Sequence, residues 1–222
     1  MVRHLLRFFV LPAIAAGLTL ALASVPVSAD DKKDEKWTPL FNGKDLTGWK
    51  THPKSAGKWR VEDGILIGSG PASHLFSERG DYENFRFRVE VAIGDKSNSG
   101  QYFRTKFGPG FPDGYEAQIN STHGDRIKTG SLYPARLKLK KGDQKKLVVE
   151  DILVKPNEWF TQEVIARGKH IVIKVNGKTT VDFVDENNNF SKGHFALQQH
   201  DPNSVVKFRK IEVIELPADK KE

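Results

Sequence analysis

Strict alternation of apolar and polar side chains over short runs is the feature that most constrains the fold of this 222-residue chain. The longest run, 85–93, has Phe, Phe, Val, Val and Ile at odd positions and three charged residues between them. A period of two is typical of a half-buried antiparallel strand. Similar shorter runs recur as far as residue 216, separated by Gly, Asn, Asp and Pro, with no helical stretch of useful length. The pattern predicts an all-β fold of about a dozen strands.

Two dipeptides mark tight chain reversals. Asp63-Gly64 and Asn176-Gly177 each separate two strand-like runs, which is the signature of a two-residue hairpin. Turn signals at this spacing favour two antiparallel sheets packed face to face, a β-sandwich. The chain has no Cys, so no disulfide supports that sandwich and its core must do so. Without an internal repeat or linker, we expect one domain over 37–217.

The two ends are expected to lie outside this domain. Residues 1–29 have a basic start, an apolar run over 8–23 and a small-x-small pattern before Asp30, which predicts a cleaved signal peptide. A retained membrane anchor is the alternative, although Pro12 interrupts an apolar run that is already short for a span. We expect an exported protein, periplasmic or secreted, without stable membrane insertion. A charged tether at 30–36 and a tail at 218–222 complete the organisation.

The charge balance argues against nucleic acid as a partner. Residues 1–29 hold two of the 35 basic residues and none of the 28 acidic ones, which leaves a net charge of +5 for the remainder. The basic residues alternate with acids instead of forming a stripe beside exposed aromatics. The segment 136–146 is the exception, and we expect it to be an exposed loop or edge ribbon.

The richest segment in chemistry is GYEAQINSTHGDRIKTGSLY, residues 114–133. Alternation places Tyr, Ala and Ile on one face of a strand at 115–120 and hydrogen-bonding side chains on the other. The loop and the next strand then add an imidazole, a second carboxylate and a phenol. The polar candidates are Glu116, Gln118, Asn120, His123, Asp125 and Tyr133.

Two further strands carry polar rows. On the first, Asn98, Tyr102 and Arg104 are expected to project together, with Gly100 opening space between them. On the other, His194, Gln198 and His200 share a face opposite Phe195 and Leu197. If the three rows line one concave sheet, they form a polar trough suited to a ligand covered in hydroxyl groups. Each residue also has a structural interpretation, such as a turn, an ion pair or a strand end.

Several known constellations are missing. The sequence has no Gly-x-Ser-x-Gly elbow, no phosphate-binding glycine loop and no Cys nucleophile. No strand carries two alternating carboxylates, which disfavours double-displacement glycoside hydrolysis. The set Glu116, His123, Asp125 and His200 could bind a divalent cation, but its spacing matches no strong metal signature, so the cofactor stays open.

From about residue 37 to 216 the chain resembles the DUF1080 family of 3-keto-disaccharide hydrolases, also described as 3-keto-glucoside 1,2-lyases with hydratase activity. The resemblance rests on six blocks in order. They are PLFNGKDLTGW (39–49), WRVEDG (59–64), NSG with FR (98–104), GYEAQI (114–119), TGSLY (129–133), and ALQ, His200, FR and Ile211 (196–211). Asn120 departs from the family, in which an acid is common.

The resemblance implies a concanavalin-like jelly roll and a carbohydrate substrate carrying a ketone at C3, supplied by a separate sugar 3-oxidoreductase. It implies removal of the C2 proton, 1,2-elimination and rehydration, which need one base instead of two carboxylates. The roles assigned on this basis are Glu116 or His123 as base, Arg104 and His200 as oxyanion stabilisers, Tyr133 as acid, and Asn98, Gln118, Asn120, Asp125 and Gln198 as substrate-binding residues. A non-catalytic carbohydrate-binding module and a one-step glycoside hydrolase are the alternatives.

Overall fold

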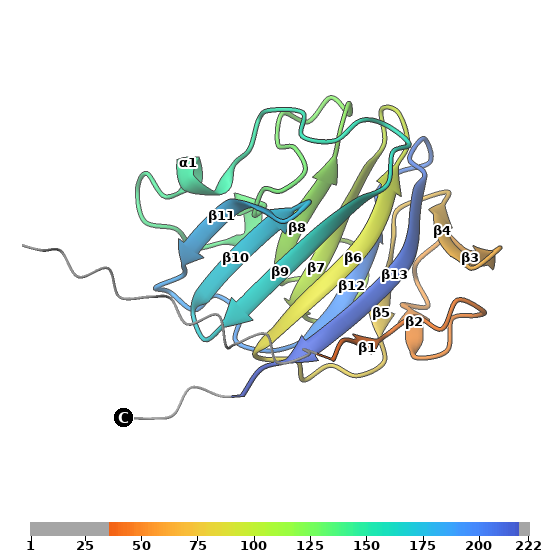
Figure 1. Ribbon diagram of the computed structural model, residues 1–222, viewed down its shortest axis with the longest axis horizontal. Helices are drawn as coiled ribbons and strands as arrows, with labels where there is room; N and C mark the ends of the chain where they lie inside the picture. The colour runs from red at the N-terminus through yellow and green to blue at the C-terminus, as the bar shows by residue number, and fades with distance from the viewer. Residues whose placement is uncertain (1–35, 218–222) are drawn as a thin grey trace, which may run out of the picture. The chain divides into compact units, whose positions relative to one another are not determined.

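The computed structural model describes residues 36–217, which form a two-sheet β-sandwich with a single short α-helix (Figure 1). The predicted all-β sandwich is confirmed. The predicted signal peptide, all of the predicted tether but its last residue, and the predicted tail lie outside the described residues. Within 36–217 no helix is long and apolar enough to cross a membrane.

The larger sheet has eight strands and the smaller sheet five. The larger sheet runs β11 (Lys178–Val184), β10 (His170–Val175), β9 (Phe160–Arg167), β6 (Phe85–Ile93), β13 (Val206–Glu215), β4 (Ile65–Ser69) and β3 (Lys58–Glu62), with β1 (Thr38–Pro39) paired to β13. The smaller sheet runs β2 (Trp49–Thr51), β5 (Ser73–Ser77), β12 (His194–Gln199), β7 (Asn98–Thr105) and β8 (Tyr115–Asn120). All strand pairs are antiparallel, and α1 (Gln144–Leu147) lies in the long β8–β9 connection.

Both predicted hairpins are present. Asp63 and Gly64 join β3 to β4 with φ angles of 49° and 77°, and Asn176 and Gly177 join β10 to β11 with 48° and 80°. Two consecutive positive φ angles define a type I′ turn, whose twist matches that of the strands it connects.

The core fills the space between the two sheets. Phe195 from the smaller sheet stacks on Phe87 of the larger one, with ring centroids 3.9 Å apart, and on Tyr82 at 4.1 Å. All three are buried, and each such side chain contributes about 1.5–3 kcal/mol of transfer free energy. Because the core occupies one face of the five-stranded sheet, the opposite face is left for other chemistry.

Candidate functional site

The outer face of the five-stranded sheet brings the predicted polar rows together. Strands β8 and β7 are in register, with Glu116 opposite Tyr102 and Gln118 opposite Gly100, and β12 lies on the other side of β7. A cavity of about 240 Å³ opens over these three strands. It is lined by Asn98, Tyr102, Phe111, Gly114, Glu116, Gln118, Tyr133, Ala135, Arg136, Gln198 and His200.

A chain of hydrogen bonds holds Glu116 in the cavity wall. The Tyr102 hydroxyl donates to Glu116 Oε2 at 2.8 Å, and Gln198 Nε2 donates to the Tyr102 hydroxyl at 3.0 Å. Gly100 provides the room, since a Cβ there would lie 2.3 Å from Glu116 Oε1. Gly100 does open space, but Glu116 and Tyr102 occupy it, so it does not lie between Asn98, Tyr102 and Arg104 as predicted.

Glu116 is set apart from an ordinary surface acid by its pKa. Burial raises the pKa of Glu116 to about 8, while the Tyr102 hydrogen bond acts in the opposite direction. The charge of Asp125 raises the pKa further, and that of Arg136 lowers it. A carboxyl group titrating near neutrality in a cavity is a candidate proton-transfer group, because its ionised form is a stronger base than an exposed carboxylate.

Three amide oxygens around the cavity have no hydrogen-bond partner. They are Asn98 Oδ1, Gln118 Oε1 and Gln198 Oε1, all on buried side chains that line the cavity. Leaving a buried acceptor unpaired costs about 1–3 kcal/mol, so such groups indicate a ligand that satisfies them. Acceptors at this density fit a ligand rich in hydroxyl donors.

Tyr133, which follows the loop after β8, also lines the cavity. Its hydroxyl donates to Asp125 Oδ2 at 2.9 Å, and burial, assisted by that hydrogen bond, raises its pKa to about 12. Asp125 Oδ1 accepts from the Ile127 backbone N–H at 2.9 Å. Asp125, predicted to bind substrate, is not part of the cavity wall and acts by holding Tyr133.

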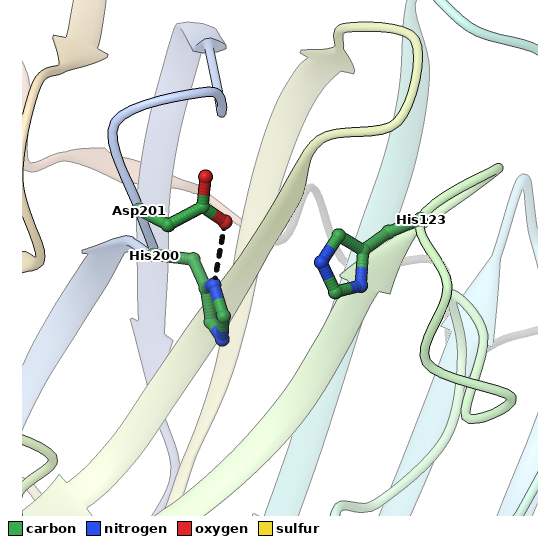
Figure 2. A group of neighbouring side chains, drawn as sticks. All are labelled: His123, His200 and Asp201. Carbon is green, nitrogen blue, oxygen red and sulfur yellow. Dashed lines mark hydrogen bonds and ion pairs between the residues drawn. The ribbon is translucent and has the colours of Figure 1, made fainter.

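His200 lines the cavity, and His123, which is not part of the cavity wall, faces it with ring centroids 5.5 Å apart (Figure 2). His200 Nδ1 lies 2.8 Å from Asp201 Oδ2. Burial acts to raise the pKa of Asp201, but hydrogen bonds from His200, Ser204 and Asn203 lower it, so Asp201 is a carboxylate acceptor. His200 Nδ1 therefore carries the proton, and its Nε2 is left as an acceptor.

His123 has the opposite tautomer. The Asp125 backbone N–H donates to His123 Nδ1 at 3.1 Å, and a backbone N–H can only donate. The proton of neutral His123 is therefore on Nε2, the nitrogen that points toward His200 and Asp201 in Figure 2. One imidazole thus presents a donor and the other an acceptor.

The predicted cation-binding set is only partly assembled. Potential ligand atoms of His123, His200 and Asp201 lie within 4.8 Å of one another, and no predicted ligand other than the two histidines joins them. Glu116 and Asp125 are instead engaged by Tyr102 and Tyr133. A cation at this group would have to displace the proton from Nε2 of His123.

Arg104 does not reach the cavity, and its predicted role there is wrong. Between Tyr102 and Thr105 strand β7 has one more residue than the facing part of β12, and Arg104 adopts a φ of 49°. This β-bulge turns the side chain out of the alternation. The guanidinium donates to the carbonyls of Glu83, Gly168 and Phe190, and the residue is 1% exposed.

Asn120, also predicted to bind substrate, is a structural residue of the loop. Its amide nitrogen donates to the carbonyls of Asp125 and Ile127, and its Oδ1 accepts from the His123 backbone N–H at 3.1 Å. All of its side-chain polar atoms are thus engaged within the protein. Asn120 therefore fixes the position of His123.

Four cavity residues were not among the predicted candidates, namely Phe111, Gly114, Ala135 and Arg136, and two of them bring large side chains. Arg136 lies at the end of a 3₁₀ turn (Pro134–Arg136) and lines the cavity, so this end of the segment expected to be an exposed loop supplies the guanidinium assigned to Arg104. Phe111 comes from the connection between β7 and β8. Neither residue belongs to an alternating run, so no periodic signal could have placed it.

A β-sandwich with a polar cavity on the outer face of one sheet, lined by unpaired acceptors, fits a carbohydrate-related function. Residues 36–214 match the 3-keto-alpha-glucoside-1,2-lyase-like domain, and the chain belongs to that family. No curated protein matches the chain in sequence.

Solved structures share the fold. A candidate glycosyl hydrolase from Parabacteroides distasonis is 24% identical, with a TM-score of 0.63 and coverage of 86% of this chain and 99% of that one. The carbohydrate-binding module CBM66 from Bacillus subtilis is 19% identical, with a TM-score of 0.54 and coverage of 74% and 93%. The VIP36 exoplasmic/lumenal domain, in a form bound to Ca²⁺ and Man₃GlcNAc, is 10% identical, with a TM-score of 0.61 and coverage of 84% and 93%. At these identities the likeness shows the fold.

Proposed function

We propose that the protein cleaves the glycosidic bond of 3-keto-glycosides, including 3-keto-disaccharides, by C2 proton abstraction, 1,2-elimination and rehydration. Family membership supports the substrate class. The observation that carries the mechanism is a single carboxyl group, Glu116, with its pKa raised to about 8 inside a cavity lined by unpaired amide oxygens. A binding module would need the acceptors but not the desolvated acid.

The chemistry requires one base because of the ketone. A carbonyl at C3 acidifies the proton on C2, and its removal leaves an enolate with the charge on the C3 oxygen. As the carbonyl re-forms, the electron pair makes a C1–C2 double bond and the C1–oxygen bond breaks. The departing oxygen takes a proton, and water then adds its hydroxyl to C1 and a proton to C2, which gives the free 3-keto sugar.

The site offers a group for each step. Glu116 is the base for the C2 proton, and the Nε2–H of His123, together with the charge of Arg136, stabilises the enolate oxygen. Tyr133, with a pKa of about 12, transfers its proton only when the leaving oxygen approaches alkoxide character. His200, predicted as an oxyanion stabiliser, is assigned the opposite role: its free Nε2 accepts a proton from the water that adds.

The pH dependence of turnover tests this assignment. We expect kcat/KM on 3-keto-trehalose to rise with pH to a plateau above about 8, because Glu116 must be ionised to act as a base. In Tyr102→Phe the hydrogen bond that lowers this pKa is lost, so the rising limb should move up by about one pH unit. A limb that stays in place, or activity that falls through this range, would contradict the role of Glu116, and no release of glucose at any pH would refute the function.

We further propose that the protein is exported and receives its substrate from a separate sugar 3-oxidoreductase. The pattern of residues 1–29 supports export, and the need for a C3 ketone supports an oxidising partner. The intact mass of the protein from its native host should correspond to a chain beginning at Asp30. A mass that includes residues 1–29 would contradict cleavage.

A further inference from the structure

A row of aromatic rings leads away from the cavity across the outer face of the five-stranded sheet. Phe111 lines the cavity, with its ring centroid 5.7 Å from that of His200. From Phe111 the row continues to His74 at 5.8 Å, from there to Phe76 at 6.0 Å, and finally to Phe107 at 5.1 Å. The row thus connects the cavity to Phe107 through His74 and Phe76, which are both buried.

The two ends of this row are unusually exposed for large apolar side chains. Phe107 is 38% exposed and Phe111 is 42% exposed, and both belong to the connection between β7 and β8. Exposed aromatic side chains beside a polar cavity indicate contact with a ligand, since their rings offer flat apolar area at little conformational cost. One face of a pyranose ring presents C–H groups that pack on such a surface.

The size of the cavity decides what this surface contacts. At about 240 Å³ it is smaller than the roughly 300–1,000 Å³ typical of sites for drug-sized ligands, so it holds one sugar ring and not two. The second ring of a disaccharide must lie outside, next to the ring that reacts. Phe111 is the cavity residue from which the aromatic row extends.

His74 supports Phe111 from within the protein. It is 2% exposed and packs edge-on against Phe111 and against Tyr102, and neither ring nitrogen makes a hydrogen bond of normal geometry. Burial lowers the pKa of His74 to about 3, against a weaker opposite effect of the Gly110 backbone, so the ring is neutral. A neutral imidazole has one donor and one acceptor, and burial keeps both away from a ring that stacks on Phe111.

We propose that Phe111 and Phe107 form a second subsite that binds the pyranose ring released from a 3-keto-disaccharide. The identity of this ring as the leaving group rests on the proposed function, since the reacting ring occupies the cavity. The stacking of a second sugar ring does not depend on the reaction and can be measured by binding alone.

The test compares a two-ring with a one-ring substrate. KM for 3-keto-trehalose and for methyl 3-keto-α-glucoside is measured for the wild type, Phe111→Ala, Phe107→Ala and the control Val184→Ala. Val184 is an exposed apolar residue on β11, in the other sheet. Each phenylalanine variant should raise KM for the disaccharide about three- to tenfold more than KM for the methyl glycoside, and the control should change neither. Equal effects on both substrates would overturn the subsite.

Calorimetric titration separates the subsite from the reaction. If the wild type cleaves neither substrate, the proposed function fails, and the subsite is then tested with unoxidised trehalose and methyl α-glucoside as ligands. The wild type should bind trehalose more tightly, and Phe111→Ala should lose most of that preference. Equal affinity of the wild type for both ligands would refute the subsite.

Discussion

Replacing Glu116 by glutamine is expected to lower kcat on 3-keto-trehalose by about 10²–10⁴-fold, the usual effect of losing a general base. Glutamine keeps the shape of the side chain and can still pair with the Tyr102 hydroxyl, but it cannot take a proton from C2. Steady-state kinetics at pH 8, with folding checked by circular dichroism, measure the effect. Wild-type turnover in a folded Glu116→Gln protein would contradict the assignment.

The same variant should be more stable than the wild type, which shows that the loss of turnover is not caused by unfolding. The pKa of Glu116 is 4.5 without the protein environment and about 8 in the folded state. A carboxyl group with a raised folded pKa is protonated in the folded state while the unfolded chain ionises, so stability falls as pH rises from about 4.5 to 8. Glutamine removes this cost. The Tm of Glu116→Gln should therefore exceed that of the wild type by a few degrees more at pH 8 than at pH 5. A gap that shrinks would contradict the raised pKa.

The second large effect concerns the substrate. Trehalose without the C3 ketone should be cleaved at least about a thousandfold more slowly than 3-keto-trehalose, because its C2 proton is far too weakly acidic for a single carboxylate to remove. Hydrolysis without the ketone normally uses a second carboxyl group, about 5 Å from the first in double displacement and about 6.5–9.5 Å in a one-step reaction, and Glu116 is the one carboxyl residue lining the described cavity. Initial rates of glucose release from the two sugars measure the difference. Comparable rates would favour a one-step hydrolase in which Glu116 activates water.

The sequence was sufficient to predict cavity residues and hairpins where the backbone is regular. Alternation placed Glu116 and Gln118 on one face of β8 and Asn98 on the same surface, and the Asn-Gly and Asp-Gly dipeptides located two hairpins. These predictions succeed because the period of an extended strand is fixed by its geometry, and φ > 0 at two successive positions selects those residues.

Irregular backbone accounts for the errors. The bulge in β7 adds one residue, which reverses the side of Arg104, and nothing in the local sequence marks it. Arg136 and Phe111 reach the cavity from loops whose path depends on tertiary packing. The opposite tautomers of His123 and His200 depend on partners one or two residues along the chain, whose roles appear only with the geometry.

The origin of the C2 hydrogen in the product tests the central claim most directly. Turnover of 3-keto-trehalose in deuterated water should leave deuterium at C2 of the released 3-keto-glucose, because elimination removes the original proton and rehydration takes its replacement from solvent. Mass spectrometry and NMR at early times, against a control of 3-keto-glucose incubated alone to allow for exchange of its α-hydrogen, measure this label. The proposed mechanism predicts close to one deuterium at C2 per turnover, whereas label no greater than in the control would contradict it, because direct attack at C1 never breaks the C2–H bond.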